Sequence, residues 1–121
     1  MNILFLSLTC LVALLHILFF VLEMFLWSKP YGRKVFGLTE EFASQSKTLA
    51  ANQGLYNGLL AVCLIWGVVK GAEATEFTLL LLTCVVIAGI YGAWSVKKTI
   101  FWVQAFPAIL AISCYLAERT I

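Results

Sequence analysis

Long apolar runs separated by short polar stretches dominate the chain. The first run covers residues 3–27, and its polar interruptions include His16 and Glu23. Further runs cover residues 49–69, 76–96 and 100–117. Each has about 20 residues, enough at roughly 1.5 Å per residue to cross a hydrocarbon core of about 30 Å. The pattern predicts four membrane-spanning helices in a single domain, residues 1–121.

The connections between these runs differ in length. The second (residues 70–73) and the third (Lys97 and Lys98) are short, so we expect sequential helices to be antiparallel in an all-α four-helix bundle. The first connection, residues 28–48, is longer. Residues 29–32 (KPYG) predict a turn, and Thr39 followed by two acidic residues predicts the start of a helix that continues into the second span.

Pro107 lies inside the fourth apolar run. Its ring removes a backbone N–H, and in lipid only neighbouring groups can compensate for the lost hydrogen bond. We therefore expect a kink in the fourth helix.

Composition and charge narrow the class of protein. Of 121 residues, 63% are hydrophobic and 12% are charged, and the mean hydropathy is +1.00, which excludes an ordinary soluble domain. The net charge is only +2 and no basic tract is present, so a nucleic-acid partner is excluded as well.

The cations are unevenly distributed between the two ends of the predicted spans. By the positive-inside rule, the first and third connections face the cytoplasm and both termini lie outside. Only Lys70 and Arg119 then fall on the outer side. The cytoplasmic cations are Lys29, Arg33, Lys34, Lys47, Lys97 and Lys98.

The first span carries polar residues at heptad spacing: Asn2, Thr9, His16 and Glu23. Residues seven apart lie on one face of a helix, about 10 Å from each other. Because an ionisable group in hydrocarbon costs a few kcal/mol, we expect this face to turn inward, with a partner for each charged or ionisable side chain.

The second span begins with the sequence AANQGLYNG, residues 50–58. Ala50, Gly54 and Gly58 share a face and predict the close approach of another helix. That face also permits a homodimer. By count of residues, His16 and Asn57 lie at a similar depth, deeper than the other polar groups.

The simplest arrangement that satisfies these polar groups together is a cavity open to the cytoplasmic side. The alternative is that they bond one another and only fix the packing of the helices. The residues that we expect to bind a ligand in the cavity are His16, Glu23, Asn52, Gln53, Tyr56, Asn57, Tyr91 and Gln104.

No motif of catalysis, phosphate binding or metal binding is present. The four cysteines fall one to each span with no C-x-x-C spacing, and a buried cysteine commonly behaves as a small hydrophobe. We expect no metal and no cofactor, and we assign no catalytic residue.

Three segments of the chain resemble a known family. They are residues 22–27 (LEMFLW), residues 34–37 (KVFG) and residues 51–58 (ANQGLYNG), together with His16. The sequence resembles the small bacterial membrane family catalogued as domain of unknown function 1304, over nearly the whole chain. The resemblance implies a four-helix protein of the bacterial inner membrane without an established activity. It implies a family pattern of His16, Glu23, Trp27, Asn52, Gln53 and Asn57.

Several functions fit these observations. The first is the binding of a membrane lipid or small amphiphile, whose polar end meets the candidate residues. Alternatives are a proton-coupled small-molecule exporter that uses Glu23, an intramembrane enzyme in which His16 and Glu23 exchange protons, and a purely structural bundle. Whether the protein is an enzyme stays open, with binding favoured.

Overall fold

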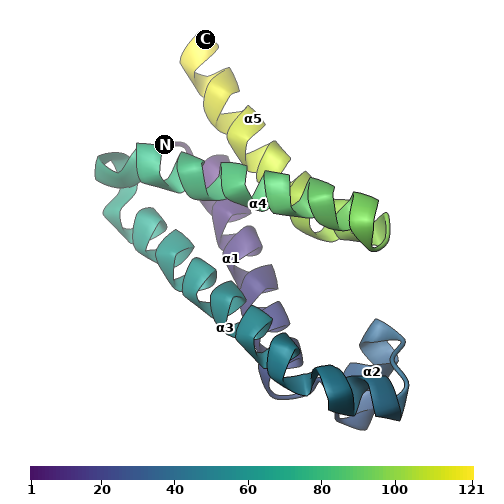
Figure 1. The fold of residues 1–121 in the computed structure, drawn as a ribbon. Coiled ribbons are helices and arrows are strands. Elements are labelled where there is room, and N and C mark those ends of the chain that lie inside the picture. The colour runs from purple at the N-terminus through teal and green to yellow at the C-terminus, as the bar shows by residue number, and fades with distance from the viewer. The chain divides into compact units, whose positions relative to one another are not determined.

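The computed structural model describes residues 1–121, which are helical with no strand (Figure 1). The four long helices and the all-α class are as the hydropathy pattern predicts. In chain order the elements are α1 (Ile3–Met24), α2 (Pro30–Phe36), α3 (Glu40–Lys70), the 3₁₀ turn η1 (Gly71–Ala74), α4 (Thr75–Ser95), the π-helical segment η2 (Phe101–Ala105) and α5 (Phe106–Thr120).

Three continuous helical stretches are long and apolar enough to cross a membrane: Ile3–Met24, Glu40–Ser95 and Phe101–Thr120. The second has 56 residues, about 84 Å at 1.5 Å per residue, far more than one crossing needs. Gly71 divides it, because its positive φ of 61° is a conformation that residues other than glycine rarely adopt. The division yields α3 and α4.

The chain forms two compact units. One contains residues 1–15 and 62–121, and the other contains residues 16–61. α1 and α3 each contribute one part to both units.

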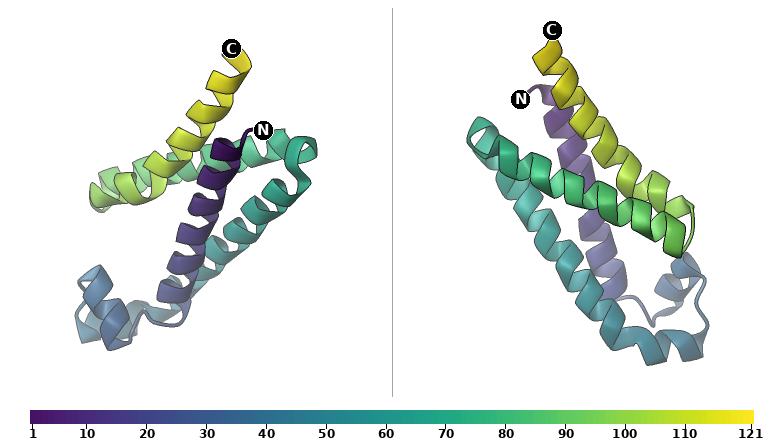
Figure 2. Two further views of the ribbon diagram at one scale, coloured as in Figure 1. Left: turned by 180° about the vertical axis from the view of Figure 1, so that it is seen from behind. Right: turned by 45° about the horizontal axis from the view of Figure 1, so that its top comes forward.

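In the first unit, α4 and the η2–α5 segment form a hairpin around the turn at residues 96–100 (Figure 2). Two glycines of α4 allow its close packing. A Cβ atom at Gly89 would lie 2.6 Å from the backbone N of Ala105, and one at Gly92 would lie 2.8 Å from Cγ2 of Ile100. The chain ends also meet here, since the backbone N–H of Asn2 donates to Glu118 Oε2 at 3.1 Å.

The irregularity expected at Pro107 takes the form of the π-helical segment that precedes it. Pro107 has no N–H to donate to the carbonyl four residues before it. The neighbouring Phe106 N–H donates instead to the carbonyl of Phe101, five residues back. One widened turn thus replaces the simple kink, as is common where the regular hydrogen-bond ladder is broken.

In the second unit, the prediction of a turn at residues 29–32 is wrong, because α2 begins at Pro30. Proline suits the first position of a helix, where its missing N–H would have no partner and its φ is already helical. α2 ends at Gly37, whose φ is 66°, and the Leu38 N–H donates to the Arg33 carbonyl at 2.9 Å.

The helix start predicted at Thr39 is confirmed. Thr39 Oγ1 accepts the Phe42 N–H at 3.1 Å, which caps α3. Glu40 and Glu41 occupy the first turn, and the helix continues without interruption to Lys70. The first apolar helix ends at Met24, three residues earlier than the apolar run indicates.

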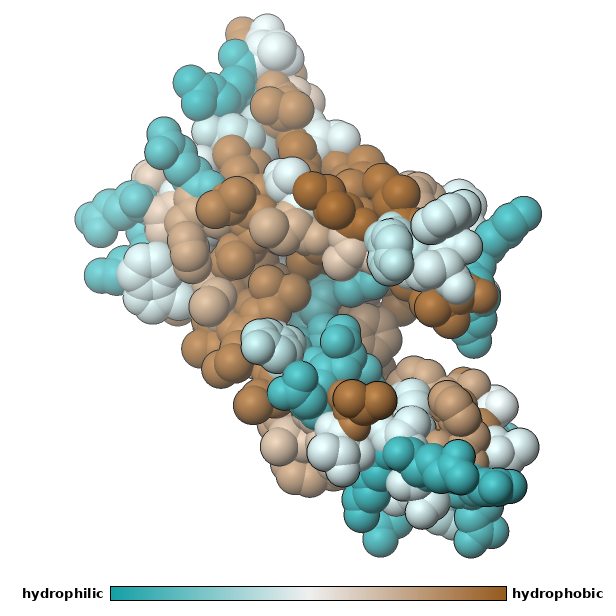
Figure 3. Space-filling model, in the orientation of Figure 1, coloured by the Kyte–Doolittle hydropathy of each residue, from teal (hydrophilic) through white to brown (hydrophobic).

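Large apolar side chains remain exposed along the long helices. Leu80, Ile87 and Val62 each expose more than 60% of their surface. In the view of Figure 3, hydrophobic residues cover most of the visible face of α4, whereas hydrophilic residues gather around α2. A surface of this kind is suited to lipid rather than water.

Replacing Gly89 by alanine is expected to destabilise the hairpin more than replacing Gly92. The new methyl group at position 89 meets backbone atoms of Ala105, which cannot move alone, whereas at position 92 the nearest atom is a side-chain methyl group of Ile100. We expect a loss of about 1–3 kcal/mol for Gly89→Ala and less for Gly92→Ala, measured by unfolding in mixed micelles. Equal effects would contradict this packing.

Candidate functional site

A seam of polar residues runs along the buried side of α1. Thr9 and His16 are 0% and 1% exposed, and Glu23 is half-buried in the last turn of the helix. Thr9 Oγ1 donates to the Phe5 carbonyl at 2.8 Å, and the His16 ring packs edge-on to Phe19 at 5.7 Å. The expectation that the heptad face turns inward is confirmed.

Glu23 is paired with Asn57 of α3. Asn57 Nδ2 donates to Glu23 Oε1 at 2.5 Å, and Asn57 is only 8% exposed. A carboxylate oxygen is a strong acceptor, so the amide gives the acid a partner without introducing a second charge. The sequence predicted both residues for the site, and the structure brings them into direct contact.

This pairing corrects the relative depth that the sequence indicated. Counting residues from the predicted span boundaries placed Asn57 level with His16. The structure places it level with Glu23, two turns further along α1. The error arose because span boundaries come from hydropathy alone, while the alignment of two helices depends on which side chains meet.

Two glycines that flank Asn57 allow the helices to come this close. A Cβ at Gly54 would lie 2.9 Å from the Met24 backbone N and 3.0 Å from Glu23 Cβ, and one at Gly58 would lie 2.9 Å from the Phe20 ring. The close approach predicted for this face is therefore made by α1 of the same chain. A homodimer stays a prediction, and in this structure α1 already covers the glycine face.

Trp27 and Ser46 form a second link between the end of α1 and α3. The indole Nε1–H of Trp27 donates to Ser46 Oγ at 2.9 Å, and Ser46 Oγ donates to the Phe42 carbonyl at 2.6 Å. The Trp27 ring also lies 4.9 Å from that of Phe36. Sequence reasoning missed Ser46, since a serine in the polar first part of a helix carries no signal of a distant partner.

Three further candidates on α3 point away from the buried seam. Asn52, Gln53 and Tyr56 are all exposed, Tyr56 by 64%. Helical spacing explains this, because the buried positions Ala50, Gly54, Asn57 and Ala61 repeat every three to four residues and leave the intervening ones outside. They form a polar surface beside the Glu23–Asn57 pair.

The last two candidates belong to the other compact unit. Tyr91 lies on α4, is 64% exposed and has its ring 6.1 Å from that of Trp94. Gln104 lies in η2 and is half-buried. The convergence of all eight residues on one cavity stays a prediction.

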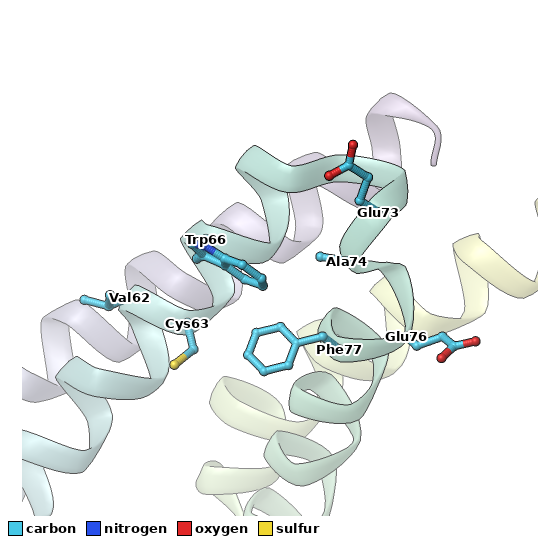
Figure 4. Close-up of a pocket in the computed structure, with 7 residues that line it drawn as sticks. All are labelled: Val62, Cys63, Trp66, Glu73, Ala74, Glu76 and Phe77. Carbon is cyan, nitrogen blue, oxygen red and sulfur yellow. The ribbon is translucent and has the colours of Figure 1, made fainter.

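The hollows on the surface of the first unit are lined by residues other than the eight candidates. One of about 590 Å³ lies at the corner between α3 and α4, where the rings of Trp66 and Phe77 are 5.3 Å apart (Figure 4). The carboxylates of Glu73 and Glu76 point away from these rings. Two more, of about 520 and 370 Å³, lie at the α4–η2 turn and near the chain termini.

The four cysteines are free thiols. No group of three or more His, Cys, Asp or Glu side chains is arranged to hold a metal ion.

The fold and the Glu23–Asn57 pair define a small all-helical protein whose long helices are apolar enough to cross a membrane, with a polar contact between two of them. The chain belongs to the DUF1304 family of proteins of unknown function, whose family model matches residues 10–116. It is 35% identical over 114 residues to the uncharacterized protein YpaA of Lactococcus lactis subsp. lactis (strain IL1403), covering 93% of this chain and 96% of that protein. No solved structure matches the chain significantly. The family indicated by the resemblance is confirmed.

The hydrogen bond between Glu23 and Asn57 is expected to contribute to stability through coupling of the two side chains. In a double-mutant cycle of Glu23→Ala and Asn57→Ala, each of which removes the hydrogen bond, we expect a coupling free energy of about 1 kcal/mol, as for other hydrogen bonds between membrane helices. The measurement is reversible unfolding in mixed micelles.

Asn52→Ala provides the matched control. It removes an exposed amide from the same helix, so it should change the unfolding free energy by less than about 0.5 kcal/mol and show no coupling to Glu23. A coupling free energy of zero between Glu23 and Asn57 would show that their hydrogen bond does not contribute to stability.

Proposed function

We propose that the protein binds the polar end of a small amphiphile or membrane lipid at the α1–α3 contact. The supporting observation is a group of exposed polar side chains, Asn52, Gln53 and Tyr56, beside the Glu23–Asn57 pair. They lie on a helical stretch that is otherwise apolar enough to cross a membrane. Polar groups exposed to lipid require a hydrogen-bonding partner, and an amphiphile head group supplies one.

The position of Glu23 supports a ligand at the membrane boundary. It lies in the last turn of α1, which ends at Met24, and its bond to Asn57 places that part of α3 at the same level. The head groups of lipids occupy this level of a bilayer. The exposed Leu55 and Leu59 continue along α3 and offer an apolar surface to a tail.

The carboxyl oxygens of Glu23 accept hydrogen bonds, so they favour a head group that donates them. An ionised carboxylate accepts bonds at about four lone-pair positions, and the bond to Asn57 uses one of its oxygens. Hydroxyl and ammonium groups are the donors that would complement it. Tyr56 and the two exposed amides add both donors and acceptors.

The purified chain is expected to retain a defined amphiphile. Asn57→Ala should weaken retention about tenfold, because Glu23 loses the hydrogen bond that positions its carboxyl group for the head group. His16→Ala should reduce retention as well, because the buried imidazole lies on the same face of α1 as Glu23, two turns away. Mass spectrometry of small molecules that co-purify, followed by titration of the molecule found, measures both effects.

Ser95→Ala is the control, because Ser95 is exposed on α4 and bonds only within its own helix; it should retain the molecule. An absence of any bound molecule, with thermal stability unchanged by added lipids, would favour a purely structural bundle. Proton-driven uptake into proteoliposomes that Glu23→Gln abolishes would favour the exporter instead.

We further propose that the protein lies in the bacterial inner membrane with both termini outside. Two contacts between the chain ends support the placement of both termini on the same side of the membrane. They are the Asn2–Glu118 hydrogen bond and the Phe5–Tyr115 ring pair at 5.4 Å. Cations then concentrate on the opposite, cytoplasmic side in the segment around α2 and at Lys97 and Lys98.

Reporter fusions test this orientation. Alkaline phosphatase fused after Ile121 should be active, because it folds outside, and a fluorescent protein fused there should be dark. The same reporters fused after Lys98 should give the opposite result, since that turn is expected in the cytoplasm. Activity of both reporters at both positions would indicate mixed topology.

A further inference from the structure

Backbone hydrogen bonds close the turn between α4 and η2, which contains Lys97 and Lys98. The N–H groups of Val96 and Lys97 donate to the Gly92 carbonyl at 2.9 and 3.3 Å, and those of Ile100 and Phe101 donate to the Lys97 and Lys98 carbonyls at 3.2 and 3.1 Å. The packing of Gly89 and Gly92 against the following segment closes the hairpin directly above this turn. These hydrogen bonds and contacts define the backbone conformation of the turn.

A hollow of about 520 Å³ opens beside the turn. Its lining is apolar and aromatic except for one lysine, and consists of Ile90, Ala93, Trp94, Lys98, Phe101 and Trp102. The π-helical segment contributes to the aromatic wall, where the Trp102 ring packs edge-on to Phe101 at 5.1 Å and lies 5.3 Å from Phe106. Trp94 and Trp102 remain 83% and 61% exposed.

The positive charge at this hollow has no compensating acid in the surrounding sequence. Between Phe77 and Ala117 the chain contains Lys97 and Lys98 and no Asp, Glu or Arg. Tryptophan favours the boundary between hydrocarbon and head groups, and lysines beside it attract anionic lipid. An aromatic wall with a cation at its edge matches an acyl chain that ends in a negatively charged head group.

We propose that this hollow is a binding site for an anionic phospholipid of the surrounding membrane, with its phosphate at Lys98 and its acyl chain against Trp94 and Trp102. The site is formed by α4, η2 and the turn between them, and it does not depend on the Glu23–Asn57 pair. The lysine supplies charge attraction and the tryptophans supply apolar contact, so loss of the lysine should remove the preference for anionic lipid but not all lipid contact.

Tryptophan quenching by brominated lipids tests the site. The full chain with Trp27→Phe and Trp66→Phe reports only on Trp94 and Trp102. In phosphatidylcholine nanodiscs, brominated phosphatidylglycerol should quench these residues more strongly than brominated phosphatidylcholine. Lys98→Gln should lower the relative affinity for the anionic lipid about fivefold, the usual effect of one lysine near a membrane surface.

Lys70→Gln is the matched control, because Lys70 is the last residue of α3, lies 6.0 Å from the Trp66 ring and does not line the hollow; the preference should persist. Native mass spectrometry of the chain with all tryptophans intact, with and without Lys98→Gln, gives the same comparison if the double tryptophan variant fails to fold. Equal quenching by both lipids, an unchanged preference in Lys98→Gln, or displacement of the lipid by inorganic phosphate would each overturn the proposal.

Discussion

The close approach of α1 and α3 at Gly54 is the constraint on which the residue 16–61 unit depends. Backbone and Cβ atoms of α1 lie where a side chain at position 54 would be, so the two helices meet almost backbone to backbone. In lipid such contact replaces the hydrophobic drive that joins helices in water. It also brings Asn57 within reach of Glu23, which allows a carboxylic acid to lie at the end of an apolar helix with a partner.

The other unit also depends on a glycine that allows two helical segments to pack closely. Gly89 lets α4 pack against the backbone of Ala105, and Pro107 breaks the hydrogen-bond ladder of the last helix. The widened turn that results is followed by the regular α5 and carries Trp102 beside the Lys98 turn. Small residues thus set the contacts in both units, and the larger polar and aromatic side chains are placed by them.

These contacts separate two kinds of polar residue in an apolar chain. Thr9, Thr78 and Ser95 each bond to the carbonyl four residues earlier in the chain, so their polar groups are satisfied locally. Glu23, Asn57, Trp27 and Ser46 bond between segments that are far apart in sequence. The exposed amides of Asn52 and Gln53 lie beside that second group, and this asymmetry is the reason to propose the amphiphile site there.

The sequence by itself determined the helices and the side of α1 that turns inward, because hydropathy period and capping residues such as Thr39 act within one segment. It also selected both Glu23 and Asn57 as site residues. Their pairing and the Trp27–Ser46 bond were decided by the tertiary structure. The physical reason is that apolar helices in lipid have no strong preference for one alignment over another. Which residues stand opposite each other is fixed by small-residue packing and hydrogen bonds between helices, and a local pattern does not encode these.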